Sequence, residues 1–354
     1  MAYTTIDRPS DYFRVKTYNG SSSDGNAITW DETDNNMQPD WLWLKNRTAA
    51  QEHWLADSVR GTGKFLESNS SNAESSDGAS GLASFNTNGF TVNDSARTNR
   101  NTMVGWGWKA SGSTASNTDG SITSTVSAST DAGFSIVSYT GNQTSGASVG
   151  HGLGVAPKMI LVKSLSEAHA WRVYHKSVGA TKELYLNLTN SAYTTSNIWN
   201  DQEPTSSVFY LGNNDTGTNK SGVTYIAYCF AEKQGYSKFG SYVGNGSTSG
   251  TYVHLGFKPA FVLLKNADEV EQWWIFDNKR NAYDGNFRYY SLNPNHSSAE
   301  GTNSADANHI DFLSNGFKLR TTAQQLNGTS DNLIYMAFAE SPFVNSNGVP
   351  NNAE

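Results

Sequence analysis

One short phrase occurs three times in this chain, at residues 38–45, 156–163 and 258–265. Each copy has proline in its second place, an unbroken run of four apolar residues, and lysine at its end. A proline followed by a short apolar run is typical of a β-strand that is buried on both faces. The repetition therefore predicts a tandem array of β-structured units.

The flanks of this phrase repeat in the same order. Each copy has a Tyr-x-Gly turn before it, a tryptophan opening a short apolar run after it, and an aromatic-rich strand at its close. The tyrosines are Tyr18, Tyr139 and Tyr242, the tryptophans are Trp54, Trp171 and Trp274, and the closing strands are expected at 103–109, 225–232 and 334–340. A period of roughly a hundred residues is long enough for one hydrophobic core per copy. We therefore expect three homologous domains.

The expected strands are short, rich in Trp, Phe and Val, and separated by clusters of Ser, Asn and Gly. Such spacing favours antiparallel sheets over alternating strands and helices. The predicted fold class is all-β, with three tandem antiparallel β-sandwich domains of a jelly-roll-like type. The predicted organisation is an N-terminal arm at 1–11, repeat 1 at 12–110, a Ser/Thr/Gly linker at 111–131, repeat 2 at 132–233, repeat 3 at 234–343 and a C-terminal tail at 344–354.

The apolar runs inside the repeated phrase, such as Met159 to Val162 and Phe261 to Leu264, do not alternate with polar residues. A strand with one wet face alternates, so both faces of these strands are expected to be covered. Either a loop of the same domain or another subunit could cover them. The second alternative predicts self-association, as a trimer, through apolar surface that a monomer would expose.

Composition argues against several classes of protein. The net charge is −7 and Lys and Arg do not cluster, so the basic surface that nucleic-acid binding needs is missing. Nowhere do 18 apolar residues run together, and Met1 to Ser10 lacks the apolar segment of a signal peptide, so we expect neither membrane insertion nor secretion. Cys229, the single cysteine, is expected to be a buried small hydrophobe, and the fold is expected to form in a reducing cytosol.

No motif predicts a cofactor. The glycine-rich segment 150–154 is followed by Pro157 and a strand, whereas a phosphate-binding loop needs a helix there, so we interpret it as a turn. The seven histidines are scattered and lack the spacing of a metal site. Asn213 to Asp215 is rich in oxygen ligands, which leaves a weak calcium loop open.

Catalysis is not expected either. Glycan hydrolysis needs two carboxylates, and acids do follow the repeated landmarks. Asp57 and Asp277 follow the first and third repeat tryptophans, and Glu232 and Glu340 end matching strands. Acids repeated at equivalent positions indicate a structural role rather than one active site.

Tryptophan side chains could stack on sugar rings. Trp54, Trp171 and Trp274 recur at one place in the repeat, which favours core packing. Trp199 and Trp273 have no such counterpart. These two are the predicted surface candidates for contact with a glycan.

Several segments carry a resemblance, namely 133–142, 151–163, 227–232, 235–240 and 338–343, together with the opening at 3–13. They resemble a tandem domain in virion proteins of marine tailed phages, including phages of cyanobacteria. The resemblance covers repeats 2 and 3 closely, whereas repeat 1 has Trp106-Gly107-Trp108 where the others end in Phe-Ala-Glu. It implies a structural or tail-fibre-like component of the particle with no known catalytic residues.

The expected function is therefore that of a non-enzymatic protein on the virion exterior, a tail-fibre-like or spike-like appendage that contacts host-surface glycans beside other virion proteins. A capsid decoration, or a head fibre or knob, is the first alternative, and a glycan depolymerase is the second. Loops 68–80, 190–204 and 293–309 differ among the repeats and are expected to carry the contact. The chain has no collagen-like or coiled-coil segment, which argues against a long fibre.

Overall fold

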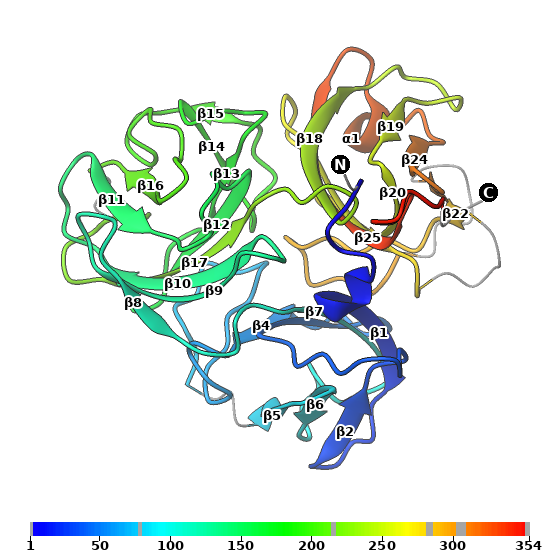
Figure 1. Ribbon diagram of the computed structural model, residues 1–354, viewed down its shortest axis with the longest axis horizontal. Helices are drawn as coiled ribbons and strands as arrows, with labels where there is room; N and C mark the ends of the chain where they lie inside the picture. The colour runs from blue at the N-terminus through cyan, green and yellow to red at the C-terminus, as the bar shows by residue number, and fades with distance from the viewer. Residues whose placement is uncertain (1–2, 77–79, 214–216, 281–285, 302–308, 351–354) are drawn as a thin grey trace.

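The computed structural model describes residues 3–76, 80–213, 217–280, 286–301 and 309–350. The fold is all-β, and every pairing between its named strands is antiparallel. Three lobes, one for each repeat, surround a common centre (Figure 1). The described helices are a 3-10 turn, η1 (Pro9–Asp11), and one short α-helix, α1 (Gln324–Asn327). Neither is long and apolar enough to cross a membrane.

Each repeat contributes one four-strand set with the same order, in which the closing strand lies between the first strand and the anchor strand of the repeated phrase. In repeat 1 the order is β1 (Phe13–Asn19), β7 (Thr102–Trp108), β3 (Trp41–Asn46), β4 (Trp54–Asp57). In repeat 2 it is β10 (Phe134–Thr140), β17 (Thr224–Phe230), β12 (Met159–Ser164), β13 (Arg172–His175). In repeat 3 it is β18 (Ser237–Val243), β25 (Asn332–Pro342), β20 (Phe257–Asn266), β21 (Trp273–Asp277).

A smaller sheet belongs to each repeat and lies toward the periphery of its lobe (Figure 1). Repeat 1 has β2 (Asn26–Thr29), β6 (Gly89–Val92) and β5 (Leu82–Asn86). Repeat 2 has β11 (Ala147–Gly150) and β16 (Val208–Leu211). Repeat 3 has β19 (Tyr252–His254), β24 (Gly316–Leu319), β23 (Ile310–Leu313) and β22 (Phe287–Arg288). In each lobe, a separate apolar cluster joins the small sheet to one face of the four-strand set.

The other face of all three four-strand sets enters one shared central core. Along β12, Met159 and Leu161 belong to that core while Ile160 and Val162 belong to the core of repeat 2. Phe338 shows how the repeats meet, because its ring lies 5.1 Å from Phe13 of repeat 1 and 6.1 Å from Phe230 of repeat 2. The anchor strands are therefore covered on both faces within one chain.

This arrangement removes the reason for which self-association was predicted. The cover of the inner face comes from the other two repeats and not from a second subunit or from a loop of the same domain. Burial of four apolar side chains on each anchor strand stabilises the fold by roughly 1.5–3 kcal/mol for each side chain. That free energy is gained here without oligomer formation.

The segment 111–131 is not a linker, contrary to the prediction. It contains β8 (Ala115–Asn117) and β9 (Ser124–Ser129), and β9 pairs with β10 so that the sheet of repeat 2 extends to eight strands with β14 (Lys182–Tyr185) and β15 (Tyr193–Thr194) at its other end. Strands at the end of a sheet need few apolar residues: β9, next to the edge strand β8, contributes Val126 to the core of repeat 2, and Ile122 just before β9 joins the same core. Because the segment contains so few apolar residues, its two strands could not be told from a linker in the sequence.

The N-terminal arm is docked on the body of the molecule. Thr4 donates from its hydroxyl to the carbonyl of Gln234, at 2.8 Å, and Ile6 lies in the central core. Near the other end, Ser346 donates from its backbone N–H to the Asp7 carboxylate at 2.7 Å. The arm and the start of the tail thus tie both ends of the described chain to repeat 3.

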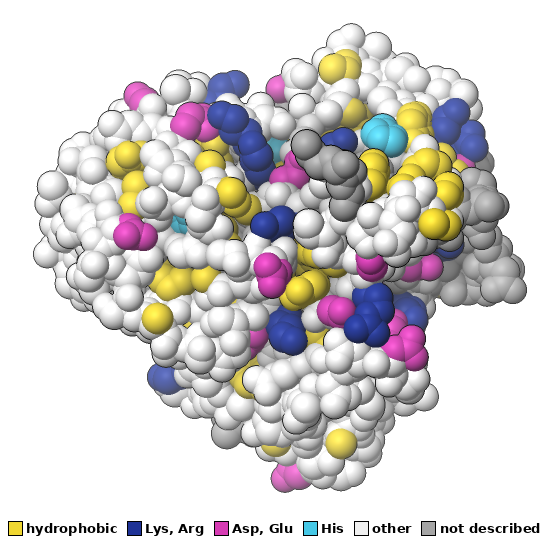
Figure 2. Space-filling model, in the orientation of Figure 1, with side chains coloured by type: hydrophobic (Ala, Val, Ile, Leu, Met, Phe, Trp, Pro, Cys, Tyr) yellow, Lys and Arg dark blue, Asp and Glu magenta, His cyan; other side chains and the backbone are white. Residues whose placement is uncertain are grey.

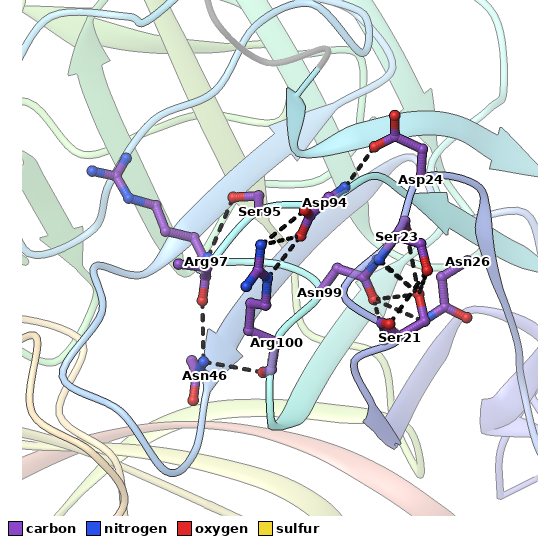
Figure 3. A network of polar contacts seen from close by, with 11 residues as sticks. Ser21, Ser23, Asp24, Asn26, Asn46, Asp94, Ser95, Arg97, Asn99 and Arg100 are labelled. Carbon is purple, nitrogen blue, oxygen red and sulfur yellow. Dashed lines mark hydrogen bonds and ion pairs between the residues drawn. The ribbon is translucent and has the colours of Figure 1, made fainter.

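The Tyr-x-Gly turns are explained by a buried asparagine that the sequence did not reveal. Tyr18 donates its hydroxyl proton to the carbonyl of Thr98, at 2.6 Å, and the next residue, Asn99, holds the turn through bonds to Ser21 and Ser23 (Figure 3). A Cβ on Gly20 would lie 2.3 Å from the Asn99 carbonyl carbon, so only glycine fits. The same device recurs in the other repeats, with the pairs Tyr139 and Asn219, and Tyr242 and Asn327.

Candidate functional site

The tryptophans predicted as surface candidates are buried. Trp199 is 2% exposed in the core of repeat 2, and Trp273 is 1% exposed in the central core. The indole N–H of Trp273 donates to the carbonyl of Tyr185 at 2.8 Å. Neither ring offers a face to a ligand, so the expectation that these two lie at the surface is wrong.

The error for Trp273 comes from a one-residue shift in the alignment of the repeats. The strand registers make Trp54, Arg172 and Trp274 equivalent, and they make His53, Trp171 and Trp273 equivalent. A shift of one residue turns a strand side chain to the opposite face. Trp171 and Trp273 therefore point into the central core, while Trp54 and Trp274 pack in the outer cores of repeats 1 and 3.

Asp57 and Asp277, two of the four acids that repeat in the sequence, belong to the contacts between lobes, whereas Glu340 pairs with Lys258 inside repeat 3. Arg60 donates to Asp57, at 2.6 Å, and to Glu74, at 3.1 Å, and Tyr228 of repeat 2 donates to the same Asp57 carboxylate at 2.7 Å. Burial alone would lower the pKa of the Arg60 guanidinium, but the carboxylates of Asp57 and Glu74 outweigh this effect and raise that pKa. Asp57 is fully buried. It is a structural anion between repeats 1 and 2.

The contact between repeats 3 and 1 is built in the same way. Arg280 donates to Asp277, at 2.5 Å, and to Glu300, at 2.9 Å. The indole N–H of Trp106 in repeat 1 donates to Asp277 at 3.0 Å, as Tyr228 does to Asp57. Arg280 is 1% exposed and Asp277 is 2% exposed, so no substrate reaches this carboxylate.

Between repeats 2 and 3 the equivalent of Asp57 and Asp277 is His175. Its Nε2 lies 3.1 Å from the carbonyl of Tyr335, and its Nδ1 accepts from the backbone N–H of Ser177 at 3.2 Å. Burial lowers the pKa of His175 to about 4, so the imidazole is neutral at pH 7. The three lobes thus close a ring in which each repeat contacts the next through the same strand end, a heterologous contact that closes after three units.

Three buried lysines close the anchor strands on the inner side of this ring. Lys45 donates to the carbonyl of Ser297 in repeat 3 at 3.1 Å, and Lys163 donates to the carbonyl of Ser71 in repeat 1 at 3.1 Å. Lys265 is bound by carbonyls of its own repeat. None of the three forms an ion pair with a carboxylate among the described residues. Burial lowers the pKa of Lys163 to about 7 and that of Lys45 and Lys265 to about 8.

A polar pocket opens where repeats 1 and 3 meet, with a volume of about 380 Å³. Two of the three loops that were predicted to carry binding line it: Asn69, Ser70 and Asn72 from the loop at 68–80, and Asn295 to Ser297 from the loop at 293–309. The other lining residues are Glu52, Glu67 and Arg97. Loops far apart in sequence therefore build one site.

The pocket side chains are held in place by one another. Arg97 forms an ion pair with Glu67 at 2.6 Å, and Asn72 donates to the other oxygen of Glu67 at 3.3 Å. Asn69 donates to Glu52 and accepts from the backbone N–H of His53 at 3.0 Å. The arrangement offers carboxylate acceptors, amide groups and a guanidinium to a ligand rich in hydroxyl groups.

Figure 2 shows charged side chains gathered where the three lobes meet, while the outer parts of the lobes carry few. Among the described residues, no group of three or more His, Cys, Asp and Glu side chains is placed to hold a metal ion. The segment Asn213 to Asp215, where a weak calcium loop was left open, includes Asn214 and Asp215, which lie outside the described residues. Cys229 is buried in the core of repeat 2, and burial raises the pKa of its thiol.

Comparison with known proteins identifies a family. The model of a family described as a domain of unknown function (DUF7483) matches residues 8–342, a span that covers repeats 1 and 2 and all but the last residue of repeat 3. No protein with a curated description and no solved structure matches the chain. The chain therefore belongs to the DUF7483 family.

Proposed function

We propose that this protein is a non-enzymatic structural component of a tailed-phage particle, displayed on the exterior, and that it binds host-surface glycans through the polar pocket between repeats 1 and 3. It would be made in the host cytoplasm and would contact other virion proteins. The observation that carries the binding step is the pocket itself, whose side chains come from loops of two repeats that share one core. The resemblance of repeats 2 and 3 to virion domains supports the proposal that the protein is part of a phage particle.

The chemistry of the pocket suits a neutral sugar. Glu52 and Glu67 accept hydrogen bonds, and Arg97, Asn69 and Asn72 can donate them, so a ring hydroxyl can find both kinds of partner. With a volume of about 380 Å³, the pocket falls at the lower end of the range for small-molecule sites, roughly 300–1,000 Å³. One or two sugar units would fit, and many copies on a particle would multiply a weak contact.

The proposal includes the finer architecture. Each repeat is taken as a small antiparallel β-sandwich of a jelly-roll-like type, formed by its four-strand set and its peripheral sheet. A homotrimer is no longer supported by the anchor strands, because their apolar faces are covered within the chain. Sedimentation velocity at micromolar concentration tests this directly, and we expect a monomer in the absence of other virion proteins.

The particle assignment is tested on purified, washed virions. Mass spectrometry should find the chain in the particles, and labelling with antibodies should place it on the tail or on the head. A position on the head would favour the alternative of a capsid decoration or head knob. Absence from washed particles would refute the virion assignment.

The glycan assignment is tested with variants of one loop. Arg97→Gln removes the guanidinium that holds Glu67, and we expect binding to host polysaccharide to weaken about tenfold, which corresponds to 1.4 kcal/mol. Arg100→Gln is the matched control, because Arg100 pairs with Asp94 on the far side of the same loop (Figure 3). If both variants bind host polysaccharide as tightly as the wild type, the assignment of glycan binding to this pocket is refuted.

One observation favours the depolymerase as a second candidate: Glu52 and Glu67 line the same pocket, and glycan hydrolysis uses two carboxylates. The test is release of reducing ends from host polysaccharide by the purified protein. Release that Glu67→Gln abolishes would replace the binding proposal with an enzymatic one.

A further inference from the structure

A second cavity lies at the contact between repeats 2 and 3, and the repeat symmetry explains its origin. One backbone hydrogen bond recurs at all three contacts: Glu74 to Leu165, at 2.8 Å, Ala192 to Ala267, at 2.7 Å, and Glu300 to Arg47, at 2.7 Å. In each case the N–H of one repeat donates to the carbonyl of the next. The three contacts can therefore be compared residue by residue.

At two contacts, an Arg–Glu pair occupies the space beside this hydrogen bond. Arg60 reaches Glu74 between repeats 1 and 2, and Arg280 reaches Glu300 between repeats 3 and 1. Between repeats 2 and 3 the corresponding residues are Val178 and Ala192, which are shorter and carry no charge. A cavity of about 240 Å³ lies there, and both residues line it.

The cavity has an apolar floor and a polar rim. The floor is formed by Val178, Ala192, Ala267 and Ile334, and the rim by Ser177, Lys182, Ser241, Asp268 and Asn332. The ammonium of Lys182 has no acidic partner among the described residues. Asp268 has no basic partner among them either, and one of its oxygens accepts from the N–H and the amide of Asn332, each at 2.8 Å.

We propose that this cavity binds one pyranose unit of the host glycan, as a second subsite that rests on the proposed function. A sugar ring has an apolar C–H face, which would lie on Val178, Ala267 and Ile334. Its hydroxyls both donate and accept, so one ring can bridge the Asp268 carboxylate and the Lys182 ammonium. Third-repeat and second-repeat side chains would then hold the same sugar.

Three further features fit a single uncharged sugar ring. Two residues before Ser177 in the chain, His175 replaces the aspartate of the sister contacts, and both of its ring nitrogens already have backbone partners. The volume of about 240 Å³ is below the roughly 300–1,000 Å³ of sites for drug-sized ligands, so it suits a single ring. A loop predicted to carry binding, 190–204, contributes Ala192 to this cavity.

The test uses methyl-labelled full-length protein and a panel of methyl pyranosides. We expect the methyl resonances of Val178 and Ile334 to shift on titration with at least one of them, with a Kd on the order of 1 mM. Val178→Arg combined with Ala192→Glu fills the cavity with the pair found at the sister contacts, and Ile334 should then no longer respond. Lys182→Ala, at the rim, should weaken the response about tenfold without filling the cavity.

The outcomes separate this inference from the proposed function. If no pyranoside shifts Val178 or Ile334, or if the filled variant responds like the wild type, the subsite is refuted. Binding of host polysaccharide that depends on Arg97 would still support the pocket between repeats 1 and 3. If polysaccharide binding does not depend on Arg97 while the methyl resonances of Val178 and Ile334 still shift, the pocket between repeats 1 and 3 is refuted as a glycan site and the cavity between repeats 2 and 3 is retained.

Discussion

The contacts between the repeats fall into two kinds. Repeats 1 and 2, and repeats 3 and 1, are joined by a buried aspartate that receives hydrogen bonds from an arginine of its own repeat and from an aromatic side chain of the next. Repeats 2 and 3 are joined by a neutral histidine that contacts a backbone carbonyl. One backbone geometry therefore supports both a charged and an uncharged contact.

The difference teaches that partners at a buried contact change together. The strand registers place Met336 of repeat 3 where repeats 1 and 2 have the donors Trp106 and Tyr228. A carboxylate facing methionine would lose its donor, and an unpaired buried charge costs several kcal/mol. His175 avoids the cost of an unpaired charge, because it is neutral and its Nε2 lies within hydrogen-bond distance of the carbonyl of Tyr335.

The largest expected effect comes from breaking a charged contact. Arg280→Met leaves Asp277 and Glu300 without their cation in a buried setting, and we expect a loss of about 3–5 kcal/mol in the free energy of unfolding. Chemical denaturation measures it. Val178→Met is the matched change at the uncharged contact and should stay within about 1.5 kcal/mol of the wild type. Equal losses in the two variants would contradict the distinction between the contacts.

The next effect concerns the lysine at the contact between repeats 1 and 2. Lys163 has a pKa of about 7 in the folded chain against 10.5 for an ordinary lysine, so the folded state releases its proton first and stability rises with pH between these values. From pH 7 to pH 9.5 we expect a gain of about 3 kcal/mol from this residue.

Denaturation of Lys163→Met at both pH values isolates the contribution. The variant should be more stable than the wild type at pH 7, and the difference should shrink toward pH 9.5. Lys176→Met, at an exposed lysine, is the control and should leave the pH dependence unchanged. A constant difference between Lys163→Met and the wild type would show that the buried ammonium does not titrate in this range.

The uncharged contact should be the more sensitive to acid. His175 has a folded pKa of about 4, below its ordinary 6.5, so its neutral form stabilises the fold above pH 6.5 and that contribution is lost as the pH falls toward 4. Between pH 6.5 and pH 5 we expect a loss of about 2 kcal/mol. His175→Gln keeps a donor without a titrating group, so unfolding curves of this variant should be flatter over the same interval. If the stability of this variant and that of the wild type fall equally between pH 6.5 and pH 5, His175 is not the group responsible for the acid sensitivity.

The smallest effect tests whether one contact can be converted into the other. Val178→Arg with Ala192→Glu restores the pair of the sister contacts at a half-buried position, where ion pairs contribute about 0–1 kcal/mol. We expect the free energy of unfolding to change by less than about 1 kcal/mol. A loss comparable to that of Arg280→Met would show that the surroundings of the two contacts, and not only these side chains, have diverged.

Much of the fold could be predicted because its signals are local. The proline, the apolar run and the lysine identified each anchor strand, and the repetition identified three units of one kind. The central core could not be predicted, because Met159 and Ile160 are equally apolar and only the tertiary structure decides which face meets another repeat. The strands β8 and β9 were missed for the opposite reason, since polar edge strands resemble linkers.

The candidate site was predictable only in part. Loops 68–80 and 293–309 could be singled out as variable segments, but nothing in the sequence brings Asn72 and Asn295 to one pocket. Trp273 was misplaced because the alignment of the repeats was one residue out, which exchanges the two faces of a strand. The second cavity required knowledge of what fills the same place at the sister contacts.

The ring closes through residues that the ribosome makes far apart in time. The ring of His53 lies 3.0 Å from the carbonyl of Asn293, and Ile6 enters a core completed by Phe338. Until the third lobe emerges, the inner faces of the first two cover each other only in part, as Trp41 does with Tyr228, and the nascent chain leaves tryptophan-rich surface exposed to solvent. Domains usually fold one after another during synthesis. In this protein the inner face of the first lobe is fully covered only when the last lobe is made. We therefore expect a premature stop after residue 233 to yield aggregates rather than a smaller working protein.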